Sequence, residues 1–214
     1  MIERIILPVV GWFVIAVCAS CVSYLVTQKQ FCLVPIPFAI TAVLLISLYR
    51  RIVRRKLQGL AVELFNKIAP VLQSGNERNL RCSILLYGRL RRQLFEVVRY
   101  SKIEANSMRP LVRLRACQGI SGLCWRTDGA RSFPEFKPTH DIFYVEQLGF
   151  QNADLNILAR DRKSALAAPV PGLDGTVEGV IIVSSIQADD FVPGCTATIA
   201  EFAAKAFRIL SARD

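Results

Sequence analysis

The sequence contains a single histidine and has long stretches without charge. His140 is the only histidine among 214 residues, which makes a histidine-rich metal site or a Ser-His-Asp triad hard to build. The seven cysteines are odd in number, so a fully paired disulfide framework does not fit. We therefore expect neither a metal centre nor a disulfide scaffold, and no motif indicates a particular cofactor.

Charge is absent from two runs near the N-terminus. There is no Asp, Glu, Lys or Arg in residues 5–28 or 30–49, and only Lys29 separates the two runs. A helix rises about 1.5 Å per residue, so about 20 apolar residues cross a hydrocarbon core of about 30 Å. Both runs are long enough to cross a bilayer. The pattern predicts a two-helix transmembrane hairpin over residues 1–49.

A cluster of basic residues follows the second run. Cations beside a span remain on the cytoplasmic side, and each interacts with anionic lipid by about 1 kcal/mol. We expect both termini in the cytosol and a multi-pass protein of the inner membrane. A cleaved signal peptide is the alternative. Against it, the second uncharged run and the basic cluster after it have the pattern of a stop-transfer signal. The basic cluster consists of Arg50, Arg51, Arg54, Arg55 and Lys56.

Residues 50–75 form a predicted connecting helix. Apolar residues recur at steps of three and four from 51 to 73, and Ser74, Gly75 and Asn76 then end the pattern. The apolar face either packs on the following domain or pairs with the same helix of a second subunit, which would give a homodimer through 51–73. The face contains Val53, Leu57, Leu60, Leu64, Ile68 and Val71, with Ala61, Phe65 and Leu72 beside it.

Residues 76–214 have the pattern of a domain that mixes strands and helices. We expect strands at 81–87 and 93–100 and a hairpin of strands at 164–171 and 177–185, joined by a Gly/Asp turn. Residues 111–116 fit a short strand or helix, and 144–150 a short helix. The amphipathic pattern of 196–210 predicts a C-terminal helix. Helices at both ends of an antiparallel sheet make the fold class α+β.

Two glycines and two prolines predict irregular structure in the middle of this domain. Gly119 and Gly122 bracket an expected turn that opens into the apolar segment at 123–125. Pro134 and Pro138 predict a surface loop over 132–141.

These segments, taken in order, resemble a GAF domain. The resemblance covers about residues 55 to 212 and depends on the strand at 81–87, Gly119-Ile120-Ser121-Gly122, the blocks at 164–170 and 179–185, and Phe191 before the last helix. It implies a pocket for a small ligand, such as a nucleotide-like molecule, over an antiparallel sheet. The Asn-Lys-Phe-Asp-Glu signature of cyclic-nucleotide GAF domains is absent. Ser121 stands where the GAF-type sulfoxide reductases have their first cysteine.

The implied pocket lies between the sheet and residues 101–158. Backbone amides at a glycine turn approach an anion, aromatic rings stack on a heterocycle, and guanidinium groups pair with phosphate. The alternatives are a tight turn without ligand, aromatic core packing and solvated surface. The candidate residues are Gly119, Ser121 and Gly122 for the amides, Trp125, Phe143 and Tyr144 for stacking, Arg113, Arg115 and Arg126 for phosphate, and Asp141 for an amine.

Three functions fit the sequence. The first is a non-enzymatic membrane-anchored sensor that binds a small ligand and signals through the connecting helix to an output protein. The second is a bacterial defence effector whose hairpin perturbs the membrane when a second messenger binds. The third is a thiol reductase that uses Cys117 and Cys124. Nucleic acid ranks last as a partner, because no zinc finger, helix-turn-helix or RNA-recognition signature accompanies the basic residues.

Overall fold

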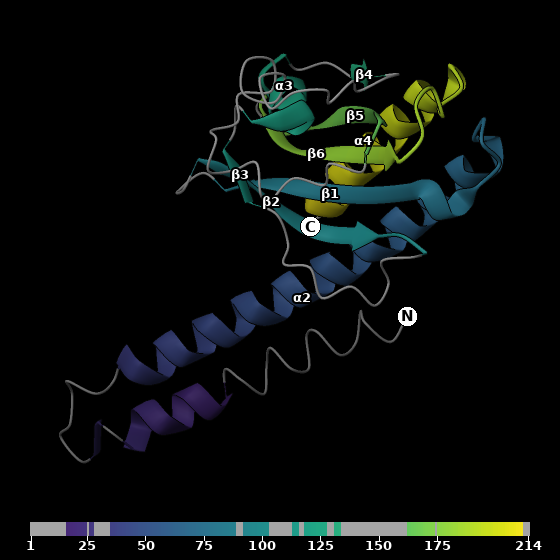
Figure 1. The fold of residues 1–214 in the computed structure, drawn as a ribbon. Helices are drawn as coiled ribbons and strands as arrows, with labels where there is room; N and C mark the ends of the chain where they lie inside the picture. Colours follow the sequence, from purple (N-terminus) through teal and green to yellow (C-terminus); the bar gives the residue numbers. More distant parts are fainter. Residues whose placement is uncertain are drawn as a thin grey trace. The chain divides into compact units, whose positions relative to one another are not determined.

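The computed structural model describes residues 16–24, 26–27, 35–88, 92–102, 113–115, 118–127, 131–133, 162–173 and 175–211 (Figure 1). The chain divides into two compact units, Met1–Val53 and Arg54–Asp214. Helix α2 (Pro35–Ile68) contributes residues to both of them.

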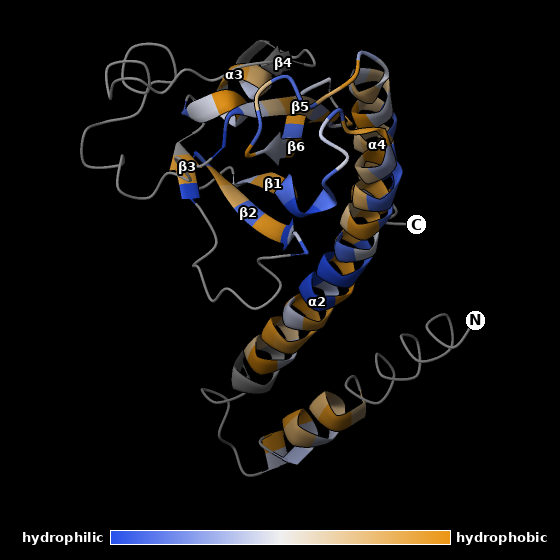
Figure 2. Ribbon diagram, turned by 45° about the vertical axis from the view of Figure 1, so that its right-hand side comes forward, coloured by the Kyte–Doolittle hydropathy of each residue, from blue (hydrophilic) through white to orange (hydrophobic). Residues whose placement is uncertain are grey.

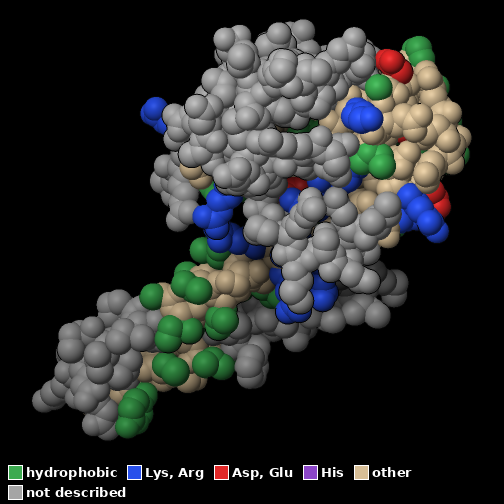
Figure 3. All heavy atoms as spheres, viewed as in Figure 1, with side chains coloured by type: hydrophobic (Ala, Val, Ile, Leu, Met, Phe, Trp, Pro, Cys, Tyr) green, Lys and Arg blue, Asp and Glu red, His purple; other side chains and the backbone are tan. Residues whose placement is uncertain are grey.

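The described part of the first unit is helical and exposes its large apolar side chains. Residues 16–24 and 26–27 are helical, and so is the first half of α2. A hydrogen bond joins Cys18 Sγ and Thr41 Oγ1, so the two segments meet there. Figures 2 and 3 show apolar residues along the described part of this unit. The exposed apolar side chains are Val17, Tyr24, Val26, Ile40, Val43, Leu44, Leu45, Ile46 and Tyr49.

Among the residues that the structure describes, no helix combines the length and the apolar character needed to cross a membrane. Residues 1–15, 25 and 28–34, which belong to the predicted hairpin, lie outside the described part. The two transmembrane spans therefore stay a prediction.

The second unit is built on an antiparallel sheet. In its described residues, six strands lie in the order β3-β2-β1-β6-β5-β4, and each neighbouring pair is antiparallel. The expected strands and the hairpin are confirmed. The strands are β1 (Leu80–Gly88), β2 (Gln93–Tyr100), β3 (Arg113–Arg115), β4 (Arg131–Phe133), β5 (Ser164–Pro171) and β6 (Val177–Ser185).

Helices cover both faces of this sheet. On one face lies the second half of α2, where the Phe65 ring meets the Tyr100 ring of β2 edge-on at 5.0 Å between centroids. Helix α4 (Gly194–Ser211) packs on β5 and β6 through Ile199 and Phe202, which are fully buried. Helix α3 (Gly119–Thr127) packs on β3, β5 and β6. This arrangement confirms the α+β class.

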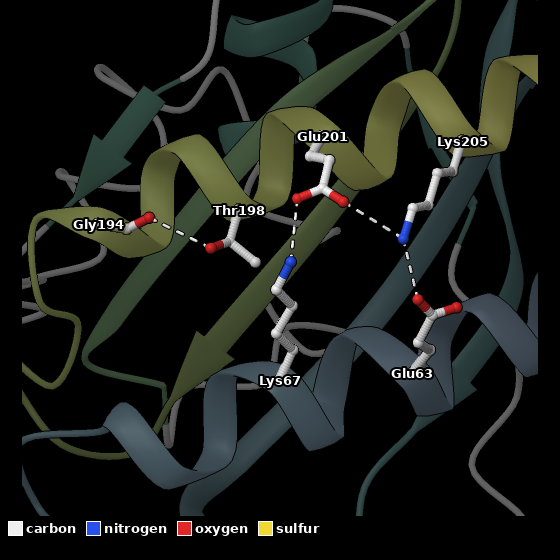
Figure 4. Close-up of polar contacts among 6 residues, drawn as sticks. All are labelled: Glu63, Lys67, Gly194, Thr198, Glu201 and Lys205. Atoms are coloured by element: carbon white, nitrogen blue, oxygen red, sulfur yellow. Dashed lines mark hydrogen bonds and ion pairs between the residues drawn. The ribbon is translucent and has the colours of Figure 1, made fainter.

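Ion pairs join α2 and α4 along their solvent-facing edge. Lys67 Nζ lies 3.0 Å from Glu201 Oε2, and Lys205 Nζ lies 2.9 Å from Glu63 Oε1 and 3.3 Å from Glu201 Oε1 (Figure 4). The two lysines pull the pKa of Glu201 below its ordinary value by hydrogen bonding to it. These side chains are about half exposed, so the buried apolar stripe of α2 contributes more to the packing than the pairs do.

The predicted connecting helix is confirmed, but it ends earlier than expected. The α-helical part stops at Ile68, and a 3₁₀ turn, η2 (Ala69–Val71), follows it. Pro70 lacks an amide hydrogen and its ring clashes with the preceding turn, which accounts for the change. Leu57, Leu64 and Ile68 are buried, so the apolar stripe packs within its own domain.

The structure corrects two expectations for the middle of the domain. Gly119 to Gly122 do not form an open turn, because they are the first residues of helix α3. Residues 131–133 form strand β4 at the edge of the sheet, whereas the sequence predicted a loop from 132 onward. The rest of that loop and the expected helix at 144–150 lie outside the described residues.

Candidate functional site

The sheet face that carries α3 is divided into an apolar half and a polar half. The apolar half lies under α3, where Cys124 contacts a buried cluster with Leu85, Leu94 and Val180. Cross-strand partners in a sheet project to the same face. Leu85 pairs with Val180 of β6, and the neighbouring pair that shares this face is Ser83 with Ile182. The polar half therefore begins at Ser83.

Trp125 belongs to the apolar half. Its indole Nε1 donates a hydrogen bond of 3.0 Å to the carbonyl oxygen of Val177, and its ring lies 4.8 Å from the Tyr87 ring, tilted by 34°. The side chain is partly buried. Both the hydrogen-bonding group and one ring face are thus engaged within the protein, which matches the alternative of aromatic core packing.

The glycine segment forms the first turn of α3. Gly119 has φ 71°, a conformation that favours glycine. The amide of Gly122 donates to the carbonyl oxygen of Gln118 at 3.0 Å, and the Ser121 hydroxyl lies 3.5 Å from the same oxygen. The Gly122 amide is therefore part of the helix, and Ser121 is buried at its start.

Arg113, the predicted arginine whose side chain is described, does not lie on the α3 face. Leu114 pairs with Leu94 and packs in the apolar cluster, whereas Arg113 pairs with Phe95 and belongs to the opposite face. The Arg113 guanidinium lies 6.0 Å from the centroid of the Phe95 ring and is exposed. For Arg115 and Arg126 only the backbone is described, in β3 and α3. Phe143, Tyr144 and Asp141 lie outside the described residues.

A β-bulge creates the polar half of the α3 face. In the register of β1 and β2, Ile84 pairs with Val98 and Leu85 with Glu96, which leaves Val97 as an extra residue. In a regular strand, residues three apart point to opposite faces. Because of the extra residue, Glu96 and Arg99 both project to the face of Ser83 and Leu85. The bulge thus puts a carboxylate and a guanidinium side by side.

Both carboxylate oxygens of Glu96 accept hydrogen bonds. Glu96 Oε1 accepts hydrogen bonds from Ser83 Oγ at 2.7 Å and from Arg99 Nε at 2.9 Å, and Oε2 accepts one from Arg99 Nη2. Glu96 is only 6% exposed. A buried carboxylate costs several kcal/mol unless it is paired and hydrogen-bonded, and these three bonds meet that requirement.

Two further hydroxyls and a second guanidinium complete the polar half. Arg81 pairs with Ser184 of β6, and its strand position puts it on the same face as Ser83. Ser101 follows β2 two residues after Arg99, and alternation along an extended chain directs it to that face. Ser101 and Ser184 are both buried. This polar half of the α3 face, which we call the half-face, therefore carries two guanidinium groups, one carboxylate and three hydroxyls.

Sequence reasoning missed this group of residues. Arg81, Ser83 and Arg99 interrupt otherwise apolar strands, and that interruption is the signal that could have identified them. Their pairing with Glu96 depends on the extra residue Val97, and hydrophobic periodicity contains no information about a bulge at that position.

The thiols of this domain that the structure describes are buried. Burial raises the pKa of Cys82 far above its ordinary value, and Cys124 is 0% exposed inside the apolar cluster. Reactive thiols are accessible to solvent, and both of these residues are buried. Cys117 lies outside the described residues. Within the described ranges, no three His, Cys, Asp or Glu residues are close enough to hold a metal ion.

Comparisons with known proteins agree on the fold. No protein-family model matches the chain, and no curated protein matches it significantly. A solved fragment of a methyl-accepting chemotaxis protein, residues 122 to 287, has a TM-score of 0.54 at 20% identity and covers 74% of this chain and 88% of that chain. The type II free methionine-R-sulfoxide reductase from Thermoplasma acidophilum has a TM-score of 0.53 at 14% identity, covering 76% and 94%.

The GAF domain/HD domain protein from Geobacter sulfurreducens is similar as well, with a TM-score of 0.51 at 14% identity and coverage of 74% of this chain and 92% of that chain. At these identities the likeness concerns the fold alone. The second unit therefore has a GAF-like α+β fold, as the sequence predicted, and this fold occurs in both ligand-binding sensors and sulfoxide reductases.

Proposed function

We propose that this protein is a membrane-anchored, non-enzymatic sensor whose GAF-like domain binds a small polar ligand on the α3 face of the sheet. The observation that carries the sensor role is the buried polar half of that face, formed by Ser83, Glu96, Arg99 and their neighbours. A purely structural sheet gains nothing from burying charged groups, because well-packed apolar residues would be at least as stable there. Polar groups on a sheet floor suit a ligand that needs orientation and recognition.

The proposed anchor is the hairpin of residues 1–49. Residues 42–47 of α2 are exposed at six consecutive positions. At about 3.6 residues per turn, these positions cover the whole circumference of the helix. A protein partner would cover one stripe, whereas lipid surrounds a helix on all sides. The basic cluster that begins at Arg50 then fits the headgroups on the cytosolic side.

The proposed signal passes through α2, whose second half packs on the sheet. Ligand binding changes the signalling state only if the ligand has different affinities for two arrangements of the domain and this helix. We propose that an output protein in the membrane or cytosol detects that difference.

The anchor is tested by substitutions that make the apolar run charged. Val43→Arg with Leu45→Arg adds two charges, each costing about 2.5 to 3.5 kcal/mol at the centre of a bilayer. The wild-type chain is expected in the membrane fraction after an alkaline carbonate wash, and the double variant is expected to be depleted from it. The matched control is Ala197→Arg with Ala200→Arg on the exposed side of α4, which should leave the distribution unchanged.

Wild-type protein that stays in solution without detergent would contradict the anchor.

The sensor role is tested by mass spectrometry of small molecules released from the purified full-length chain. We expect one compound to be released reproducibly and in a fixed ratio to the protein, and a protein that carries none and shows no thermal shift across a metabolite library would contradict it.

A further inference from the structure

We propose that the polar half of the α3 face binds an oxyanion group, a carboxylate or a phosphate, of the ligand. This inference rests on the proposed sensor function and names the chemistry of its site. It depends on three properties of the described residues: which hydrogen-bonding groups the half-face presents, their net charge, and one buried hydroxyl.

The half-face presents mainly donors. Its carboxylate, Glu96, already accepts from Ser83 and from two nitrogens of Arg99. The register also brings Arg81 and the hydroxyl of Ser184 to this face, and Ser101 follows β2 two residues after Arg99. Guanidinium groups donate only, and hydroxyls donate one proton each. Such a surface is complementary to an acceptor-rich group.

The charge of the half-face agrees with this complementarity. Two guanidinium groups and one carboxylate give its described residues a net positive charge. Arg99 is oriented by its bidentate contact with Glu96, which holds the side chain close to the sheet. Guanidinium geometry suits the two oxygens of a carboxylate or phosphate. An oxyanion therefore fits this site better than a cation or a neutral amine does.

Ser101 provides an independent observation. The residue is 3% exposed, and its Oγ has no hydrogen-bond partner among the described residues. A buried hydroxyl without a partner is costly. A ligand oxygen above the face would accept its proton, and the same oxygen would lie within reach of Arg81, which pairs with Ser184 on the adjacent strand.

The test measures anion binding by the full-length chain in zwitterionic detergent, with radiolabelled inorganic phosphate and with acetate in separate equilibrium dialyses. Arg81→Gln removes a proposed cation, and Ser101→Ala removes only a hydroxyl and is the milder change. Arg78→Gln is the matched control, because Arg78 is exposed, lies three residues before Arg81 and loses the same charge. Thermal unfolding verifies that each variant is folded.

We expect the wild type and Arg78→Gln to bind equally, Arg81→Gln to bind about tenfold more weakly or worse, and Ser101→Ala to be weakened several-fold. Tighter binding of phosphate assigns a phosphate group, and tighter binding of acetate a carboxylate. Equal binding by Arg81→Gln, Ser101→Ala and Arg78→Gln would overturn the inference, since the anion would then be held elsewhere. If a neutral molecule is released from the purified chain, the oxyanion inference fails and the sensor proposal stands. If no molecule is released and neither anion binds, both fail.

Discussion

Cys82 illustrates how burial at a single residue sets a pH dependence. Its thiol is fully buried on β1, and desolvation raises its pKa above the ordinary value of 9.0. The folded protein keeps the thiol protonated where the unfolded chain ionises it. The contribution of the protonated thiol to the free energy of unfolding is therefore complete below about pH 9. Above that pH it falls by about 1.4 kcal/mol per pH unit. We expect the stability advantage of the wild type over Cys82→Ala to shrink above pH 9.

The measurement is denaturant unfolding of both proteins between pH 7 and pH 10.5. The subtraction removes the other titrating groups, because both proteins share them. A difference in unfolding free energy that stays constant over this range would show that Cys82 is accessible to solvent in the folded state. Alkylation in native buffer is the second measurement, and Cys82 is expected to react only after denaturation.

At the residue scale, the sequence did not locate the arginines that lie on the α3 face. It left open whether cations of this domain contact an anionic ligand or form solvated surface, and Arg113 was among the candidates. The register puts Arg113 on the face opposite α3, whereas Arg81 and Arg99 lie on the α3 face. The difference arises from the bulge at Val97 and from strand pairing, which are long-range properties of the sheet.

Asp190 joins elements that are far apart in the sequence. It is 0% exposed in the connection between β6 and α4. Its Oδ1 accepts from the Ser74 amide at 2.8 Å, its Oδ2 accepts from the Ser185 hydroxyl, and its backbone oxygen accepts from the Gln73 amide at 3.0 Å. The carboxylate thus holds the turn that follows α2 against the sheet.

We expect Asp190→Ala to lower the unfolding free energy by about 3 kcal/mol, because the buried Ser185 hydroxyl and the partly buried Ser74 amide lose their acceptor. The control is Asp189→Asn, at an exposed neighbour whose φ of 52° asparagine tolerates, and it should change the stability by less than about 0.5 kcal/mol. Denaturant unfolding gives both values, and hydrogen exchange should show faster exchange at Ser74 in Asp190→Ala. Equal stabilities of the two variants would refute a structural role for the Asp190 carboxylate.

At the element scale, periodicity predicted the long elements well and the short ones poorly. The apolar stripe of α2, the hairpin of β5 and β6 and the face of α4 each repeat a pattern over many residues. Helix α3 was predicted as a turn because Gly119 and Gly122 are turn residues. Gly119 does take a positive φ, but the chain then continues as a helix. Packing on β3, β5 and β6 outweighs the weak helix propensity of glycine.

At the scale of the whole molecule, the sequence predicted a membrane hairpin followed by a sensory domain. The second unit has the GAF-like fold of that prediction, and its sensory role stays a prediction. The first half depends on residues 1–15 and 28–34, which lie outside the described part. In the first unit, apolar side chains along α2 are exposed, and this exposure is unfavourable in water and favourable in lipid. The orientation of the proposed hairpin then depends on the basic cluster.

If the basic cluster determines orientation, its removal should weaken the preference for cytosolic termini. Replacing Arg50, Arg51, Arg54, Arg55 and Lys56 with Gln leaves only Arg4, Lys29 and Lys67 as cations near the proposed spans. Orientation responds to cations within about 15 to 20 residues of a span. We expect the wild type to keep a C-terminal reporter entirely in the cytosol, and the five-Gln variant to expose it outside in a measurable fraction of chains. The control replaces five exposed cations of the domain with Gln: Arg78, Arg92, Lys102, Lys163 and Arg208.

The reporter is a tandem of a protein that fluoresces only in the cytosol and a phosphatase that is active only outside. The control variant should behave as the wild type does, because its substitutions lie too far along the chain to bias insertion although they remove the same charge. Phosphatase activity from the wild type would contradict cytosolic termini. If the five-Gln variant keeps the wild-type orientation, the cluster does not set topology, and its role is reduced to contact with anionic headgroups, which binding to vesicles with and without phosphatidylserine would then measure.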